Sequence, residues 1–371
     1  MRKTLFNPTE EDTIMLTLAR KTLHRTLAAL AAAILAVPAG AAEENRFQGV
    51  TLRVATWGGQ WRDMLRDHVA KEVERRGGKV EYVIGSPTEN FAKLAAARGQ
   101  VPFDVMEILG TNLHELLGRN LLAKLRLKDI PNTRNIAPDQ VTDHAVATWF
   151  TEELIMYNRP KLQELGIAPP ESLADLRNPK LAGRVMIPDI SSGGGIEALG
   201  AFAFAAGGNE QNIAPGLKLI SEIPGVRFWK TGGEVVTQLK SGDVWVAVAH
   251  GGWAVRAANA GIPVATVLPK IGSKRGTMKE GYVGVIRGSR HQDAAEFFIN
   301  AYLDNEVQFQ LAQKLGTVPT NPDARARLVG LPVIKDLIEL DSTRIGNMLR
   351  LDPAKIDLTS WLDQWNKSVA R

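Results

Sequence analysis

The sequence predicts an α/β protein whose mainly parallel sheets are flanked by helices. Strand-like and helix-like segments alternate from residue 51 to residue 108, and consecutive β-α-β units of this kind need right-handed crossovers and parallel strands. Short apolar segments followed by small-residue turns recur between residues 183 and 286. The chain has 371 residues, which is enough for two lobes of ordinary domain size.

Residues 1–42 are typical of a secretory signal peptide. A basic segment at residues 20–25 precedes an apolar run, Leu27 to Val37, that is too short to span a bilayer as a mature helix. Small residues follow, and we expect cleavage after Ala41 or Ala42. The sequence therefore predicts a periplasmic protein that is exported through a cleavable leader.

Composition agrees with export and excludes several classes of protein. The chain has no cysteine, so it is neither a disulfide scaffold nor a thiolate zinc site, and it has no lipid-modified cysteine as an anchor. The 45 basic and 40 acidic residues nearly balance. Such a balance gives no reason to expect a nucleic-acid partner. We expect a soluble monomer.

The expected elements follow from apolar periodicity and from glycine at helix ends. In the first part, the expected strands are Thr51–Thr56, Val80–Ile84 and Phe103–Ile108. Two helices are expected between them. The first has an apolar stripe of Trp61, Leu65, Val69 and Val73 and ends at Gly77-Gly78, and the second is Thr88–Arg98. Later strands are Gly183–Pro188, Val244–Ala249 and Val283–Ile286, with a helix at Ile196–Ala206. The tail is helical, with one-turn spacings in Ala294/Phe298/Tyr302, Val307/Leu311/Leu315 and Trp361/Trp365.

No catalytic or metal-binding motif stands out. Gly58-Gly59 lacks the third glycine of a dinucleotide fingerprint, and the chain contains no phosphate loop, no HExxH and no GxSxG. The histidines have no spacing typical of metal ligands. We therefore expect neither an enzyme nor a site for a cofactor or metal.

Turns at the carboxyl ends of the predicted strands are the best candidates for ligand contact. Trp57 ends the first strand, and the glycines after it favour a cleft-facing side chain over core packing. Ser191 and Ser192 open a glycine-rich helix start, which either holds an anion or is a plain N-cap. The same alternatives apply to Thr231. His250 and Trp253 follow another strand, where Trp253 either contacts ligand or packs in the core.

Short motifs follow one another in a specific order along the whole exported chain. They are LRVATWGG (52–59), Ser86 with Lys93-Leu94, Phe103-Asp104-Val105, Tyr157-Asn158, Ile187-Pro188-Asp189, Leu239–Asp243, Ala294–Leu303 and Gly316–Asn321. In this order they resemble the extracellular solute-binding proteins of ABC importers, in the branch that includes the spermidine/putrescine-binding proteins.

The resemblance implies a two-lobed, type II periplasmic binding protein fold with the ligand cleft between the lobes. We expect the chain to cross between lobes near Val146–Met156 and to return near Glu280–Ile286. The expected parts are residues 47–149 and 284–316 for lobe 1, 150–283 for lobe 2, and 317–371 for C-terminal helices that pack on the lobes. The closed form would be presented to an ABC permease in the inner membrane, with no bond made or broken.

The resemblance also implies a small nitrogenous solute, polyamine-like and cationic. Polyamine binders use aromatic walls and carboxylates, because a desolvated cation needs an anion or a π face. Trp57 matches the first aromatic wall, and Ser86 matches a polar position of the family. On the return strand, Glu280 and Tyr282 replace a Trp-x-Asp pattern, so an acid and an aromatic are kept in exchanged order.

Carboxylates at the first crossing distinguish this chain from the family pattern. Residues Phe150-Thr151-Glu152-Glu153 replace Trp-Gly-Thr-Thr, and Glu152 either meets a ligand amine or belongs to a solvated hinge that pairs with a residue such as Arg159. An anionic or zwitterionic ligand (an amino-acid derivative, opine or phosphonate) held by Ser191–Gly195 is the alternative within the class. A secreted hydrolase is the alternative outside it.

Overall fold

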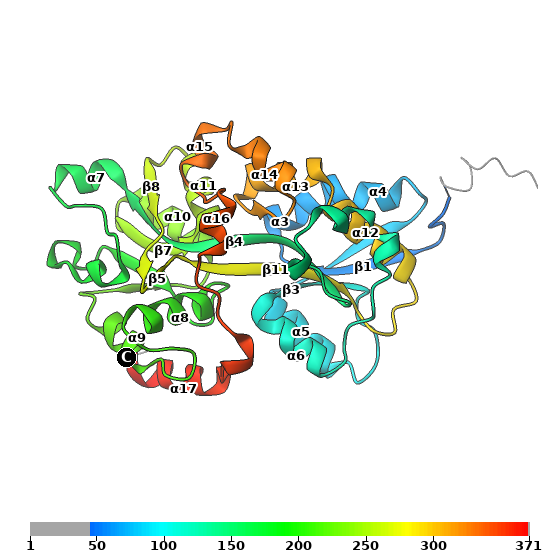
Figure 1. Cartoon of the computed structure of the whole chain (residues 1–371), viewed down its shortest axis with the longest axis horizontal. Coiled ribbons are helices and arrows are strands. Elements are labelled where there is room, and N and C mark those ends of the chain that lie inside the picture. The colour runs from blue at the N-terminus through cyan, green and yellow to red at the C-terminus, as the bar shows by residue number, and fades with distance from the viewer. Residues whose placement is uncertain (1–44, 370–371) are drawn as a thin grey trace, which may run out of the picture.

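The computed structural model describes residues 45–369, which form two lobes joined by strands that run across the middle of the molecule (Figure 1). The predicted leader, residues 1–42, lies outside the described residues. Among residues 45–369, no helix combines the length and the apolar character that a membrane crossing requires.

One curled sheet passes through both lobes in the strand order β2-β1-β3-β11-β4-β7-β5-β6. The strands are β1 (Thr51–Thr56), β2 (Lys79–Ile84), β3 (Val105–Leu109), β4 (Ala145–Asn158), β5 (Val185–Pro188), β6 (Arg227–Trp229), β7 (Val246–His250) and β11 (Thr277–Val285). The pairs β1–β2, β1–β3, β5–β6 and β5–β7 are parallel, as predicted for each lobe. The pairs that β4 and β11 make are antiparallel, so the complete sheet is mixed.

The two long strands β4 and β11 connect the lobes and span both predicted crossings. They pair with each other from Thr277↔Glu153 to Gly284↔Ala145, with a bulge between Gly281 and Tyr282. Every residue of β4 except the last is buried. Two short strands, β8 (Val264–Val267) and β12 (Val318–Pro319), also pair with β4, whereas β9 (Lys270–Ile271) and β10 (Lys274–Arg275) form a separate hairpin.

The lobe that contains β1, β2 and β3 is covered by helices on both faces of its sheet (Figure 1). The helices are α3 (Gly59–Met64), continued by the π-helical turn η1 (Leu65–Ala70) and α4 (Lys71–Glu74), then α5 (Pro87–Ala96), α6 (Gly110–Gly118), α12 (Gln292–Tyr302) and α13 (Asn305–Leu315). The predicted stripe is fully buried at Leu65, Val69 and Val73. Gly316, with a φ of 69°, ends α13 as predicted.

The second lobe surrounds β5, β6 and β7 with α7 (Arg159–Glu164), α8 (Gly195–Ala205), α9 (Ala214–Ser221), α10 (Gly232–Ser241) and α11 (Gly251–Asn259). Single 3-10 turns connect many elements: η2 (Leu127–Asp129), η3 (Pro131–Asn135), η4 (Pro138–Gln140), η5 (Leu173–Arg177), η6 (Pro179–Leu181) and η7 (Pro353–Lys355). Apolar side chains of α8 and α9 pack against β5 and β7 and form the main core of this lobe.

The C-terminal segment, residues 320–369, passes over the crossing strands and ends on the second lobe (Figure 1). It contains α14 (Pro322–Leu328), α15 (Pro332–Lys335), α16 (Ser342–Gly346) and α17 (Leu358–Ser368). Trp361 and Trp365 are both 2% exposed, and the indole of Trp361 donates to the carbonyl of Glu210 at 2.9 Å. The predicted docking of a last helix through this tryptophan pair is confirmed.

Candidate functional site

The carboxyl ends of strands from both lobes meet beside the two crossing strands. β1 and β3 lead into α3 and α6 in one lobe, and β5 and β7 lead into α8 and α11 in the other. Parallel strands place ligands at this edge of a sheet because the loops and helix N-termini gather there. The site therefore has to be sought where the loops of the two lobes face each other.

A cavity of about 280 Å³ lies between α6 of one lobe and α8 of the other. We call it the interlobe cavity. The crossing strand β11 contributes Lys279, Glu280 and Tyr282, α8 contributes Glu197, and Arg350 of the C-terminal segment completes the charged part of the lining. Both lobes and one crossing strand thus share a single cavity, whose size is near the lower end for small-molecule sites.

Glu280 presents a free acceptor in this cavity. The hydroxyl of Tyr282 donates to Glu280 Oε2 at 3.1 Å, and burial raises the pKa of that phenol. Arg350 Nη2 lies 3.5 Å from Glu280 Oε1, but among the residues that the structure describes no group donates a hydrogen bond to this oxygen. Glu280 is therefore oriented by Tyr282 and can still accept a donor from a ligand.

A buried charged cluster adjoins the cavity and ties the crossing strands to the loop before α8. Lys279 Nζ donates to the carbonyl of Gly193 and lies 3.2 Å from His250 Nε2. His250 Nδ1 lies 2.5 Å from Glu153 Oε1, within ion-pair distance although not aligned as a hydrogen bond. Gly194 permits this approach, because a Cβ there would overlap Glu153 Oε1 and the His250 ring.

Burial changes the pKa of the groups in this cluster in different directions. Desolvation lowers the pKa of Lys279 and of His250, and it raises the pKa of Glu197. The opposite charges partly compensate, since Glu197 and Glu153 each favour the charged form of Lys279. Lys279 is thus a buried amino group in the field of two carboxyl groups, at the edge of the interlobe cavity.

Three tryptophans form a cluster at the end of β1. The ring centroids of Trp57 and Trp61 are 5.0 Å apart, and Trp149 of β4 lies 5.8 Å from Trp57 and 5.3 Å from Trp61. Glycine is required at position 281, opposite Trp149 in the sheet, because a Cβ there would overlap the Trp149 indole. Trp57 is half-buried. It therefore packs on the core with one side, and only its remaining surface can face a ligand.

Glu107 lies beneath this tryptophan cluster and is fully engaged. It is 1% exposed, and its carboxylate accepts hydrogen bonds from the Thr56 hydroxyl, from the Trp61 indole at 2.9 Å and from the Tyr302 hydroxyl at 2.7 Å. Burial raises the pKa of Glu107 to about 7, against the opposing effect of these donors. We assign it a structural role in joining β1, α3 and α12.

The residues predicted from the sequence lie in several places. Glu280 and Tyr282 share the interlobe cavity, and His250 belongs to the adjacent charged cluster. Trp253 packs its indole against Gly232, where a Cβ would overlap it, and the Arg256 guanidinium lies 4.2 Å from its ring centroid. This contact agrees with the core-packing alternative for Trp253.

The predicted hydroxyl side chains make local hydrogen bonds. Ser86 forms a capping box with Glu89 at the start of α5, and Thr231 forms one with Glu234 at the start of α10. The Ser191 hydroxyl donates to Asp189 Oδ1 at 2.5 Å, and Ser192 accepts weakly from the Gly194 N–H at 3.4 Å. These contacts match the plainer interpretation, in which the residues cap helices and shape turns.

Glu152 does not share a cavity with Glu280. Its side chain is fully buried under the C-terminal segment, on the face of β4 opposite to that of Glu153. It does not pair with Arg159. The expectation of a solvated hinge surface at Glu152 is therefore wrong, because residues 336–344 cover it.

Two important side chains were not singled out by sequence reasoning. Glu197 is the one charged residue in the otherwise apolar α8, and a single acid in such a helix indicates a residue with a specific role. Lys279 lies next to Glu280 in a strand, and only the tertiary fold shows that it meets Gly193. Within residues 45–369, no group of side chains has the composition and spacing of a metal site.

Comparisons with known proteins agree with this geometry. The model of the bacterial extracellular solute-binding protein family matches residues 70–339. A putrescine/cadaverine-binding protein of Pseudomonas aeruginosa is 26% identical over 328 residues, which cover 81% of this chain and 88% of that protein. The spermidine/putrescine substrate-binding protein PotD of Streptococcus pneumoniae has a similar structure, with a TM-score of 0.70, 17% identity, and coverage of 87% of this chain and 98% of that one.

A further structural neighbour binds a different kind of solute. The periplasmic binding protein MotA of A. tumefaciens, solved in complex with glucopine, has a TM-score of 0.67 and 20% identity, over 85% of this chain and 98% of that one. These likenesses establish a two-lobed binding-protein fold, and they leave the ligand of the present chain to be argued from its own cavity.

Proposed function

We propose that this chain, which belongs to the family of bacterial extracellular solute-binding proteins, binds a small polyamine-like cation in the interlobe cavity. Members of this family are the solute-binding components of transport systems, and the family is not an enzyme family. They bind their solutes outside the cytoplasm and work with ABC permeases. The proposed role is therefore capture in the periplasm, after removal of the leader, and delivery to a permease in the inner membrane.

The observation that carries the choice of ligand is the free acceptor on Glu280. Glu280 lines the interlobe cavity, and its Oε1 receives no hydrogen bond from the described residues, while Tyr282 binds the other oxygen. An ammonium group supplies the missing donor and adds to the positive charge of Arg350, which lies 3.5 Å from this oxygen. Tyr282 adds an aromatic ring to the lining, which suits a cationic or methylene-rich ligand.

A second carboxylate lines the same cavity from the other lobe. Glu197 begins α8, whereas Glu280 belongs to the crossing strand, so a diamine could engage both. A ligand that binds groups from both lobes stabilises the closed arrangement more than the open one. Support from outside the structure is the similarity to the putrescine/cadaverine-binding protein.

A zwitterionic or anionic solute is the second candidate, and one observation favours it. Lys279 and Arg350 line the cavity beside the two glutamates, so a ligand carboxylate would also find a partner there. The neighbouring structure in complex with glucopine shows that this fold accommodates such solutes. A molecule with both an amine and a carboxylate would use both sets of charges.

A thermal-shift panel separates the two candidates. Mature chain would be melted with putrescine, cadaverine and spermidine, and in parallel with amino acids, opines and phosphonates. At a ligand concentration one hundred times the dissociation constant, the folded state gains about 2.7 kcal/mol, which corresponds to a shift of several degrees. We expect a shift with a polyamine. A shift only with anionic compounds would replace the ligand and keep the transport role.

A further inference from the structure

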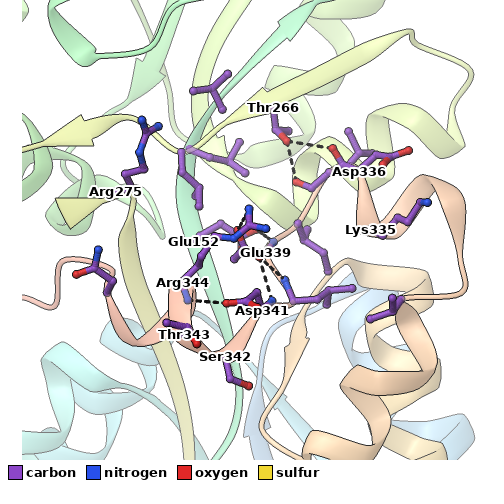
Figure 2. A pocket seen from close by; sticks show the side chains of 18 residues that line it. Glu152, Thr266, Arg275, Lys335, Asp336, Glu339, Asp341, Ser342, Thr343 and Arg344 are labelled. Carbon is purple, nitrogen blue, oxygen red and sulfur yellow. Dashed lines mark hydrogen bonds and ion pairs between the residues drawn. The ribbon is translucent and has the colours of Figure 1, made fainter. Parts of the chain in front are cut away.

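A second and larger cavity lies beside the crossing strand β4 (Figure 2). Its volume is about 950 Å³, it is open to solvent on one side, and it is lined by β4, β8 and the segment from α15 to α16. We call it the hinge cavity. Because side chains alternate along a strand, Glu153 faces His250 while its neighbour Glu152 faces this cavity.

Glu152 is incompletely satisfied in the wall of the hinge cavity. Its Oε1 accepts a hydrogen bond from the backbone N–H of Glu339 at 2.9 Å, but its Oε2 has no partner among residues 45–369. The side chain is 0% exposed. A buried polar atom without a partner costs stability, so Glu152 keeps an unused acceptor at this oxygen.

The surroundings hold Glu152 in this position. A Cβ on Gly251 would lie 2.7 Å from Glu152 Oε1 and 2.8 Å from Ile338 Cγ2, so the glycine is needed to admit the carboxyl group. The turn at Glu339 is itself ordered, since Glu339 Oε1 accepts hydrogen bonds from the N–H groups of Leu340 at 3.1 Å and Asp341 at 3.0 Å. The position of Glu152 is thus built by several contacts.

The charges around the cavity favour a cation at Glu152. Figure 2 shows Glu339 beside Glu152, with Arg344 nearby. The Arg344 guanidinium is 3.3 Å from Glu339 Oε2 and so is already paired. Arg275 and Lys335 line the cavity but are exposed, and Glu152 is the buried acid of the lining. A buried carboxyl group with an empty acceptor favours a cationic donor, which would stabilise its ionised form.

We propose that the hinge cavity is a second binding site, separate from the interlobe cavity, and that it takes a small primary ammonium whose N–H group binds Glu152 Oε2. Three further features support the choice. A primary ammonium has three donors, it neutralises the carboxylate, and it is compact enough to reach a buried oxygen. Burial raises the pKa of Glu152 to about 8, and a bound ammonium would reverse this effect.

Equilibrium dialysis with labelled putrescine tests the proposal, with succinate as a dianion of similar length. The Glu280→Gln chain serves as the starting protein, so that binding in the interlobe cavity does not mask the second site. We expect this protein to keep one putrescine site, which Glu152→Gln weakens at least about tenfold, as for the loss of a charge-assisted hydrogen bond. Succinate should not bind there.

Two variants make the result specific. Asp336→Asn removes an exposed acid that lines the same cavity, and it should leave the affinity nearly unchanged. Thr343→Trp places a large side chain at an exposed position of the lining and should block the site without removing a charge. Melting curves confirm that each variant folds.

Two results would overturn the proposal. One is the absence of putrescine binding in the folded Glu280→Gln chain, and the other is equal weakening by Glu152→Gln and Asp336→Asn. If the interlobe cavity takes an anion instead of a polyamine, the dependence on Glu152 is still measurable. The two proposals can therefore fail separately.

Discussion

Glu152 and Glu153 are adjacent in the sequence, yet they have different roles because strand alternation places them on opposite faces of β4. Glu153 lies 2.5 Å from His250 in the charged cluster, whereas Glu152 accepts from the Glu339 N–H under the C-terminal segment. Sequence alone places both at the first crossing as neighbouring carboxylates. At this scale, the face of the strand decides which ligand each carboxylate can meet.

Glu107 gives a prediction for the pH dependence of stability. Its pKa is raised from 4.5 to about 7 in the folded protein, so the folded chain keeps a proton that the unfolded chain has released between these pH values. The stabilising contribution is complete below about pH 4.5 and is lost as the pH rises through about 7. Between these pH values, the free energy of unfolding of the Glu107→Gln variant should fall by on the order of 3 kcal/mol less than that of the wild type.

Denaturant unfolding of both proteins at pH 5 and pH 8 measures this difference. Glu115→Gln is a suitable control, because Glu115 forms a surface ion pair with Arg119 at 2.7 Å and is largely exposed. The control should follow the wild-type pH dependence. Parallel curves for wild type and Glu107→Gln would show that Glu107 is ionised in the folded protein throughout this range.

Lys279 links elements that are distant in the sequence. It belongs to β11, but its ammonium binds the carbonyl of Gly193 before α8 and approaches His250 at the end of β7. Glu153 and Glu197 supply the compensating negative charge. The crossing strand is thereby fixed to the loops of the second lobe through one buried cation.

Replacement of Lys279 by methionine should destabilise the protein substantially. The change keeps a flexible, unbranched side chain but removes the donor to the Gly193 carbonyl and the positive charge near Glu153 and Glu197, which costs on the order of 2 kcal/mol. The double variant Lys279→Met/Glu197→Gln should recover part of the loss, since it also removes one uncompensated acid. Guanidinium unfolding measures both values.

Lys274→Met is the matched control for this prediction. Lys274 is in the short strand β10 and contacts Asn347 at 3.3 Å on the surface, so its loss should change the free energy of unfolding little. If Lys279→Met were as stable as this control, the ammonium would not hold β11 to the loop before α8.

Elements with strong local signals were predicted most accurately. The bounds of β1 agree with those expected, α5 lies within two residues of the predicted helix Thr88–Arg98, and Gly316 ends α13. The short strands from β8 to β10 are not predicted, and the C-terminal helices from α14 to α16 are predicted without bounds, because two- to seven-residue segments contain too little periodicity to be recognised. Their positions depend on pairing with β4 and on packing over the crossing strands.

The binding site was only partly predictable for a related reason. Glu280 and Tyr282 were found through the family pattern of the return strand, and both line the interlobe cavity. Ser86 and Thr231 satisfy helix ends instead, a role that the same residue types serve in any N-cap. Lys279 and Glu197 could not be paired from sequence, since they lie on separate elements that only tertiary packing brings together.

At the scale of the whole molecule, the interlobe cavity and the hinge cavity both lie beside the pair of crossing strands. The interlobe cavity includes Lys279 and Glu280 of β11, and the hinge cavity includes Glu152 and Leu154 of β4. Because β4 and β11 connect the lobes, a change in the angle between the lobes would bend or twist these two strands. The bounds of the lobes themselves, at residues 149 and 284, stay a prediction.

The most direct test is isothermal titration of the mature chain with putrescine, for wild type, Glu280→Gln and Asp139→Asn. Glu280 and Asp139 both lie 3.5 Å from Arg350, but only Glu280 lines the interlobe cavity, so the two variants disturb the same arginine differently. We predict saturable binding that Glu280→Gln weakens at least about tenfold and Asp139→Asn leaves nearly unchanged. Equal affinity in all three proteins, or no binding of putrescine by the wild type, would contradict a polyamine site at Glu280.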